Sequence, residues 1–125
     1  MNLNIMSVDV EDWFCVYNLS HRIRFDEWAT CESRVERNMT RLLDLFARHR
    51  IEATCFVLGW IAERFPDLVR EIESRGHEIA THGYSHRLLT HMTEEEFRAF
   101  LQRERAQGLG LGLEGLDGKA GTTRS

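Results

Sequence analysis

The sequence has no disulfide pattern, no long apolar segment and no excess of positive charge. Its three cysteines, Cys15, Cys31 and Cys55, are odd in number and not spaced as a zinc motif, which indicates free thiols and a reducing compartment. No basic start leads into an apolar run of signal or membrane length, so we expect a cytoplasmic protein without a membrane span. The formal charge of -4 gives no reason to expect nucleic acid binding.

What is present is a globular composition with alternating elements: 42% of the residues are hydrophobic and 29% are charged, which is typical of a folded domain. Capping boxes at Ser33 with Glu36 and at Thr93 with Glu96 predict two helix starts, and Pro66 suits the first turn of another helix. Short apolar runs between these helices predict strands. The expected elements are strands at residues 3–8, 53–58 and 77–80 and helices at residues 33–48, 66–76 and 93–101.

This β-α-β-α-β-α order predicts an α/β fold with a parallel sheet and helices packed outside it. Periodicity allows either a β/α barrel or an open doubly wound sheet. A closed barrel usually needs about 200 residues or more, whereas this chain has 125. Either the fold is small and open, or the chain is incomplete.

Two groups of polar residues predict a divalent-metal site. His82 and His86 are four residues apart, so both imidazoles could lie on one face of a helical turn and bind one ion. Asp9, Glu11 and Asp12 begin where the first expected strand ends, at the sheet edge where α/β folds place their chemistry. Each group alone has a simpler explanation, because such a histidine pair arises by chance and such acids also form solvated loops or helix caps.

Three segments together resemble a known family. Residues 7–13 (SVDVEDW), 53–60 (ATCFVLGW) and 76–86 (GHEIATHGYSH) are similar to the motifs of the NodB-homology polysaccharide deacetylases, carbohydrate esterase family 4. The most similar branch is the one encoded beside exosortase and exopolysaccharide gene clusters. The resemblance spans about residues 3–105, and it implies a distorted β/α barrel and metal-dependent removal of N-acetyl groups from a polysaccharide.

The resemblance also assigns roles to the polar residues. His82 and His86 match the two metal-binding histidines of the family, and Asp9 matches the catalytic base. Glu11 is our first choice for the metal-binding carboxylate, because residues two apart lie on the same side of an extended chain. Asp12 is a close rival, since the usual family pattern has adjacent aspartates. Two histidines and a carboxylate suit Zn²⁺, with Co²⁺, Ni²⁺ or Mn²⁺ as possible replacements.

Three neighbouring side chains have more than one interpretation. Trp13 and Phe14 follow the acids and either form the rim of a sugar-binding site or cover the core. His77 either supports the metal-binding side chains from behind or belongs to the core. We expect His91 to lie on the surface.

The end of the sequence departs from the family. The arginine motif, the aspartate/tryptophan motif and the late histidine that acts as general acid cannot be matched. Six of the nine glycines lie between Gly108 and Gly121, at spacings that disfavour a helix. We therefore predict a partial deacetylase domain at residues 1–106 and a disordered or aberrant tail at residues 107–125, from a truncation or frameshift or as a flexible linker.

Two functional hypotheses follow from the sequence. The first is a metal-dependent hydrolase of carbon–nitrogen bonds in an N-acetylated polysaccharide, with an allantoinase-like hydrolase of a small amide as a neighbouring possibility. The second is a catalytically silent fragment that keeps only the metal half of the site. Without a general acid, we expect weak activity or none from this chain. The sequence does not indicate an oligomeric state.

Overall fold

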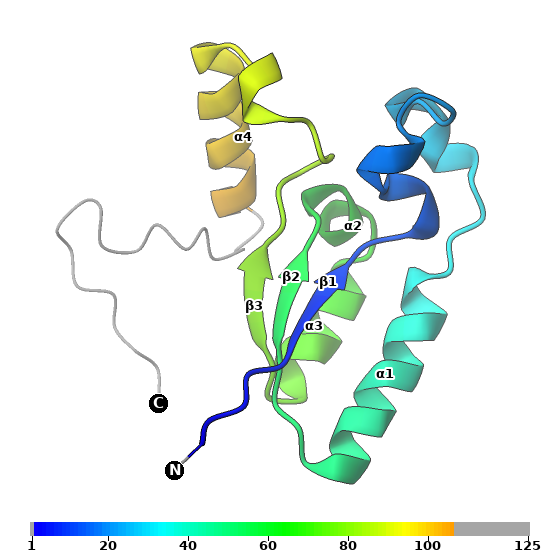
Figure 1. The fold of residues 1–125 in the computed structure, drawn as a ribbon, viewed down its shortest axis with the longest axis vertical. Coiled ribbons are helices and arrows are strands. Elements are labelled where there is room, and N and C mark those ends of the chain that lie inside the picture. The colour runs from blue at the N-terminus through cyan, green and yellow to red at the C-terminus, as the bar shows by residue number, and fades with distance from the viewer. Residues whose placement is uncertain (1, 107–125) are drawn as a thin grey trace, which may run out of the picture.

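The computed structural model describes residues 2–106, which contain a three-stranded parallel sheet with helices beside it (Figure 1). The strands β1 (Ser7–Val10), β2 (Thr54–Val57) and β3 (Glu78–Thr81) lie in the order β1-β2-β3. Val10 is opposite Val57, and Val57 is opposite Thr81. The predicted α/β class with a parallel sheet is confirmed. The predicted tail at residues 107–125 lies outside the described residues.

The expected helices form, whereas one further α-helix and four short 3₁₀ helices were not predicted. The α-helices are α1 (Val35–His49), α2 (Gly59–Arg64), α3 (Pro66–Ser74) and α4 (Glu94–Ala106). Short 3₁₀ helices are η1 (Trp13–Cys15), η2 (Tyr17–Leu19), η3 (Phe25–Thr30) and η4 (Leu89–His91). Helix α2 has six residues, which is too short to show an apolar period in the sequence.

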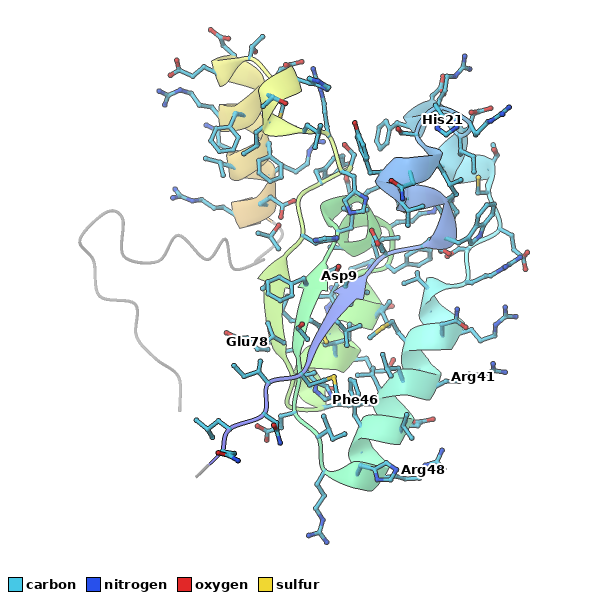
Figure 2. The ribbon with its side chains drawn as sticks, in the orientation of Figure 1. Asp9, His21, Arg41, Phe46, Arg48 and Glu78 are labelled. Atoms are coloured by element: carbon cyan, nitrogen blue, oxygen red, sulfur yellow. The ribbon has the colours of Figure 1, made fainter. Side chains whose placement is uncertain are left out.

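One apolar core joins the sheet to the helices. Alternate strand residues such as Val10, Cys55 and Val57 are buried against it, because successive side chains of a strand point to opposite faces. Phe46 extends from α1 toward the strands, whereas Arg41 points away from the sheet (Figure 2). The core side chains contributed by α1 and α3 are Val35, Met39, Leu43, Phe46, Leu68 and Ile72.

The two predicted capping boxes have different outcomes. The box at the start of α4 is confirmed: the Thr93 N–H donates to Glu96 Oε2 at 2.8 Å, and the Glu96 N–H donates to Thr93 Oγ1 at 3.2 Å. The box predicted at Ser33 and Glu36 was wrong. Ser33 Oγ instead donates to Asp12 Oδ2 at 2.6 Å, so a carboxylate from a distant part of the chain lies at the start of α1.

The first strand also begins later than predicted. It starts at Ser7 instead of residue 3, and Asp9 is therefore part of β1 and does not follow it. Glu11 and Asp12 come directly after the strand ends at Val10. In residues 2–106, no helix has the length and apolar character needed to cross a membrane.

Candidate metal centre

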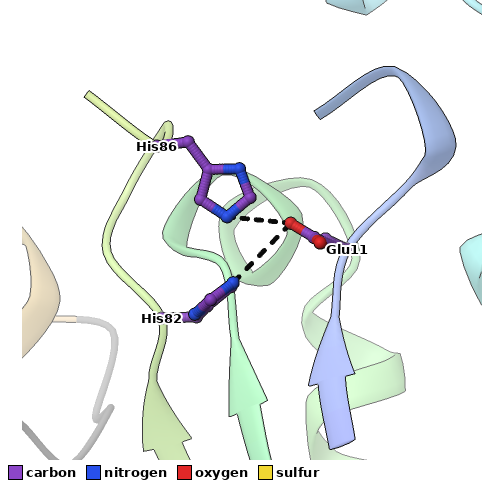
Figure 3. Close-up of side chains that lie close together, drawn as sticks. All are labelled: Glu11, His82 and His86. Atoms are coloured by element: carbon purple, nitrogen blue, oxygen red, sulfur yellow. Dashed lines mark ion pairs between the residues drawn. The ribbon is translucent and has the colours of Figure 1, made fainter. Parts of the chain in front are cut away.

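Three of the predicted site residues meet at the carboxyl edge of the sheet. Glu11 follows β1, and His82 and His86 follow β3 (Figure 3). Because the strands are parallel, their carboxyl ends lie at one edge, which brings together residues more than 70 positions apart in the chain. The His82 N–H donates to Val57 O at 3.1 Å, so the histidine segment stays attached to β2 beyond the end of β3.

The distances within this cluster suit a small metal ion. One ligand atom from each of Glu11, His82 and His86 can be chosen so that all three lie within 4.8 Å of one another. Glu11 Oε2 is 2.8 Å from His86 Nε2 and 3.7 Å from His82 Nε2. Ligands at 2.0–2.2 Å from tetrahedral zinc are separated by roughly 3.4 Å. Small rotations of these side chains would therefore accommodate the ion.

The hydrogen bonding of His86 gives a chemical reason for a cation here. His86 Nδ1 lies 2.6 Å from the Cys15 carbonyl oxygen, which can only accept, so Nδ1 carries the hydrogen. In the neutral ring, Nε2 then presents a lone pair to Glu11 Oε2, itself an acceptor. The 2.8 Å contact is an ion pair only if the ring is protonated, and Oε2 is buried with no hydrogen-bond partner among the described residues. Two acceptors this close require a proton or a metal ion between them.

Electrostatics in the metal-free protein are consistent with this arrangement. The Glu11 carboxylate is the largest influence on His86 and raises the pKa of that imidazole above its ordinary value, while burial acts in the opposite direction. The hydrogen bond to Cys15 adds to the increase in pKa. A metal ion would therefore replace a proton that the site already attracts.

The spacing of the histidines predicted a helical turn, and this prediction was wrong. Residues 82–86 form an irregular loop in which Gly83 has φ 77° and His86 has φ 57°. The left-handed conformation is unfavourable for a histidine and costs roughly 1–2 kcal/mol. It turns the His86 ring back toward His82, and the two rings meet edge to face with centroids 4.7 Å apart. Strain of this kind is common where a side chain has a functional position.

Helix α2 holds the histidine loop in place. The Gly59 N–H donates to Gly83 O at 2.7 Å, and the Trp60 N–H donates to Tyr84 O at 3.0 Å. The approach is so close that a Cβ at Gly59 would lie 3.1 Å from Tyr84 Cα and 2.7 Å from Tyr84 Cδ2. In the sequence, Gly59 is only the residue that follows the strand predicted at residues 53–58. Its close contact with the histidine loop could not be predicted, because the sequence shows only a glycine at the end of a strand.

Asp9 lies beside the cluster and is more open to solvent. Its Oδ2 is 3.6 Å from His82 Nε2, and its side chain is 58% exposed, against 19% for Glu11. In residues 2–106 the Asp9 carboxylate forms no hydrogen bond, although it lies within ion-pair distance of His82. The buried carboxylate is thus placed like a ligand, and the exposed one is accessible to water and substrate.

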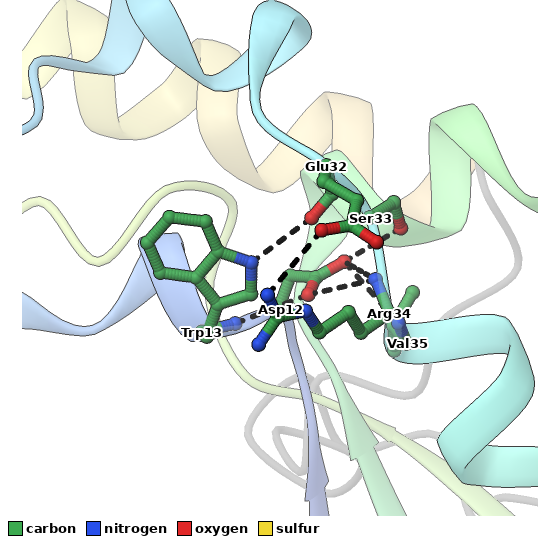
Figure 4. Close-up of polar contacts among 6 residues, drawn as sticks. All are labelled: Asp12, Trp13, Glu32, Ser33, Arg34 and Val35. Carbon is green, nitrogen blue, oxygen red and sulfur yellow. Dashed lines mark hydrogen bonds and ion pairs between the residues drawn. The ribbon is translucent and has the colours of Figure 1, made fainter.

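Asp12 is not brought into the cluster. Its side chain is buried, and both oxygens accept hydrogen bonds from other groups (Figure 4). The donors are Ser33 Oγ at 2.6 Å, the Arg34 N–H at 3.0 Å, the Val35 N–H at 3.3 Å and the Trp13 N–H at 3.2 Å. The carboxylate therefore lies at the start of α1, and of the two rival acids only Glu11 faces the histidines.

A cavity of about 490 Å³ opens beside the histidines, between their loop and α4. His82 and His86 line one side of it. Its other walls are mainly apolar, with Tyr17, Leu88, Leu89, Phe97, Phe100 and Leu101. Of the two aromatics beside the acids, Phe14 is buried in the core and Trp13 is exposed.

Comparisons with known proteins identify the family of this chain. The profile of the polysaccharide deacetylase family matches residues 22–107, and the chain belongs to that family. It is 43% identical over 58 residues to a peptidoglycan-N-acetylglucosamine deacetylase of Bacillus cereus, which covers 46% of this chain and 21% of the relative. It is 46% identical over 50 residues to a chitooligosaccharide deacetylase of Rhizobium leguminosarum bv. trifolii, covering 40% of this chain and 23% of the relative.

Solved structures show the same fold. A Mycobacterium smegmatis protein assigned to the polysaccharide deacetylases has a TM-score of 0.62 at 28% identity, covering 86% of this chain and 40% of that one. A peptidoglycan N-acetylglucosamine deacetylase crystallised with an N-oxidanyl-benzamide has a TM-score of 0.57 at 26% identity, covering 82% of this chain and 38% of that one. These relatives are β/α barrels. The NodB-type resemblance is confirmed at the family level, whereas the exosortase-associated branch and the truncation stay predictions.

The matches cover only part of each relative. This chain spans about a fifth of the length of the curated relatives named above and about two fifths of the solved ones. The shared part includes the segment with His82 and His86, which lies within the family match at residues 22–107. Asp9, Glu11 and Asp12 lie before the start of that match.

Proposed function

We propose that residues 1–106 are the metal-binding part of a deacetylase that hydrolyses N-acetyl groups on a polysaccharide. The observation that carries this proposal is the buried Glu11 Oε2, which has no hydrogen-bond donor among the described residues and faces Nε2 of His86 at 2.8 Å. Glu11, His82 and His86 would hold one divalent ion. Zn²⁺ is the best candidate for two imidazoles and one carboxylate, and Co²⁺, Ni²⁺ or Mn²⁺ could replace it.

The donor set leaves room for water and substrate. A catalytic zinc site keeps three protein ligands and an open position, whereas a structural site is closed by four. When bound, the ion supplies Lewis acidity, which polarises a carbonyl and lowers the pKa of nearby water. The Cys15 carbonyl accepts the Nδ1 hydrogen of His86, so Nε2 of that ring is left as a ligand atom.

Asp9 is the proposed general base. Its exposed carboxylate is 3.6 Å from His82 Nε2, so it lies next to the metal ligands without replacing one of them. From there it can take a proton from the water whose oxygen bonds to the acetamide carbonyl carbon. Collapse of the resulting tetrahedral intermediate breaks the carbon–nitrogen bond and releases acetate and the sugar amine, which takes up a proton. The exposure of Asp9 allows water and an N-acetylated sugar to reach it together.

The substrate class follows from the relatives. The Bacillus cereus relative is a deacetylase of peptidoglycan N-acetylglucosamine, and the Rhizobium leguminosarum relative is a chitooligosaccharide deacetylase. Both names specify deacetylation of a glycan, and the first specifies N-acetylglucosamine. We propose the same class of substrate for this protein, in cell-envelope or exopolysaccharide metabolism.

The comparisons do not favour the silent-fragment hypothesis, because the matched relatives are deacetylases. In this sequence, however, neither the motif that orients the base nor the late general acid of the family can be matched. We therefore expect the 125-residue chain to bind metal and to release acetate slowly or not at all. Turnover with Zn²⁺ near that of a complete relative, measured as acetate release from an N-acetylglucosamine oligomer, would overturn this expectation.

Two substitutions separate the roles of base and ligand. In any form of the protein that shows turnover, Asp9→Asn should keep its zinc and lose activity by about 10²-fold or more. His82→Ala should lose the zinc itself. Elemental analysis of the purified variants measures the metal, and acetate release measures activity. Equal loss of zinc in both variants would show that Asp9 is a ligand and that the base has been assigned wrongly.

A further inference from the structure

We infer that Asp12 is a positioning residue, which fixes the metal centre to the start of α1 instead of binding the ion. This inference rests on the proposed metal site. It concerns the short segment from Glu11 to Cys15, which carries two groups of the centre: the Glu11 carboxylate and the Cys15 carbonyl that holds His86. Asp12 lies between these two groups and ties them to a helix of the core.

The contacts of Asp12 cap the start of α1 from another part of the chain. The Arg34 and Val35 N–H groups at the start of α1 donate to its carboxylate at 3.0 and 3.3 Å, and Ser33 Oγ donates at 2.6 Å. Those N–H groups have no partner inside the helix, and the positive end of the helix dipole favours a carboxylate. The side chain is only 3% exposed, so its negative charge depends on these donors.

Among residues 2–106, no arginine forms an ion pair with this buried carboxylate. The guanidinium of Arg34 pairs with Glu32 at 3.3 Å and lies over the Trp13 ring, 5.6 Å from its centroid. The Trp13 N–H donates to Asp12 Oδ1 at 3.2 Å. Asp12 is therefore held by amide and hydroxyl donors with fixed directions, which makes it a precise attachment of one segment to another.

The attachment continues into the metal centre through η1. The Asp12 carbonyl accepts the Cys15 N–H at 3.0 Å, which closes the single turn of η1. The Cys15 carbonyl then accepts the Nδ1 hydrogen of His86 at 2.6 Å. Immediately before Asp12, Glu11 projects toward both histidines. Any shift of Asp12 thus moves Glu11 and the support of His86 together.

A set of four proteins tests this inference by Co²⁺ binding and by unfolding of the metal-free chain. The proteins are the wild type, Asp12→Asn, the double variant Asp12→Ala/Ser33→Asp, and Thr93→Ala. Asp12→Asn directs an amide NH₂ group at the donors of α1. The double variant returns a carboxylate to the start of α1 from the helix's own side, but leaves residues 11–15 unattached. Thr93→Ala removes the cap of α4, away from the attachment, and controls for a general loss of helix stability.

Asp12→Asn should weaken Co²⁺ binding by 10–100-fold, the usual effect of losing a group that orients metal ligands. The double variant should recover much of the stability of α1 while its Co²⁺ affinity stays low and its visible spectrum differs from that of the wild type. Thr93→Ala should lower the unfolding midpoint and leave Co²⁺ affinity unchanged.

Three results would overturn the inference, in two different ways. Recovery of both stability and Co²⁺ affinity in the double variant would mean that Asp12 only stabilises α1. Wild-type affinity in Asp12→Asn would have the same meaning. Failure of the wild type itself to bind Co²⁺ or Zn²⁺ would instead refute the proposed metal site, and with it the inference that rests on it.

Discussion

The two edges of the sheet hold histidines in opposite situations. At the amino edge, before β3, His77 is buried against Phe46, and its Nδ1 accepts the Ala53 N–H at 3.1 Å. At the carboxyl edge, after β3, His86 has one nitrogen satisfied by Cys15 and the other facing Glu11, an acceptor without a donor. One edge pairs a donor with an acceptor, and the other places two acceptors together.

This difference separates a structural histidine from a ligand. His77 is buried and His86 is half-buried, and each ring contacts a neighbouring ring. The deciding feature is whether the ring nitrogens are complemented within the protein. At the amino edge folding completes the pairing, whereas at the carboxyl edge the pairing needs a cation.

The largest expected contrast is between the two histidines themselves. His86→Ala should raise the Kd for Co²⁺ by more than about 100-fold, beyond the effect expected from losing an orienting group alone. His77→Ala should leave this Kd unchanged and lower the free energy of unfolding by about 1–3 kcal/mol, because it leaves the buried Ala53 N–H without an acceptor. Titrations with Co²⁺ and urea denaturation measure both quantities. Weaker metal binding in His77→Ala would break the contrast between the edges.

A smaller contrast is expected between two glycines. Gly59→Ala should push the histidine loop away from α2, which we expect to lower metal affinity about tenfold and stability by about 1–3 kcal/mol. Gly76 has φ 90° and an open position, so Gly76→Ala should cost about 1–2 kcal/mol of stability and leave metal affinity unchanged. If both variants bind Co²⁺ like the wild type, the loop does not depend on α2.

The smallest effects on stability are expected at the two non-glycine residues with positive φ in residues 2–106. Arg50, which ends α1, has φ 54°, and His86 has φ 57°. Arg50→Gly should stabilise the protein by at most about 1 kcal/mol, since relief of strain is offset by the greater freedom of glycine in the unfolded chain. His86→Gly relieves the same strain but should abolish metal binding. Thermal unfolding in the absence of metal compares the gains in stability of the two variants. An Arg50→Gly variant less stable than the wild type would contradict this explanation.

The sequence predicts the architecture well where the signals are local. Alternating elements, the α4 capping box and Gly76 at positive φ after α3 all follow from patterns within a few residues. The meeting of Glu11 with His82 and His86 could also be predicted, because parallel strands place their carboxyl ends together.

The features that the sequence did not predict depend on contacts between distant segments. The sequence could not choose between Glu11 and Asp12, because that choice depends on the donors at the start of α1, more than 20 residues away. The same contact explains why the expected capping box at Ser33 did not form. Helix α2 was too short to recognise, so its support of the histidine loop was missed.

A zinc-bound crystal structure, with the ion located by its anomalous scattering, tests the central claim most directly. We expect one zinc ion at about 2.0–2.2 Å from a Glu11 oxygen and from Nε2 of His82 and of His86. In the same crystal Asp12 should keep its hydrogen bonds to Ser33 and α1. Zinc bound by Asp12, or located away from the His82–His86 loop, would contradict the account.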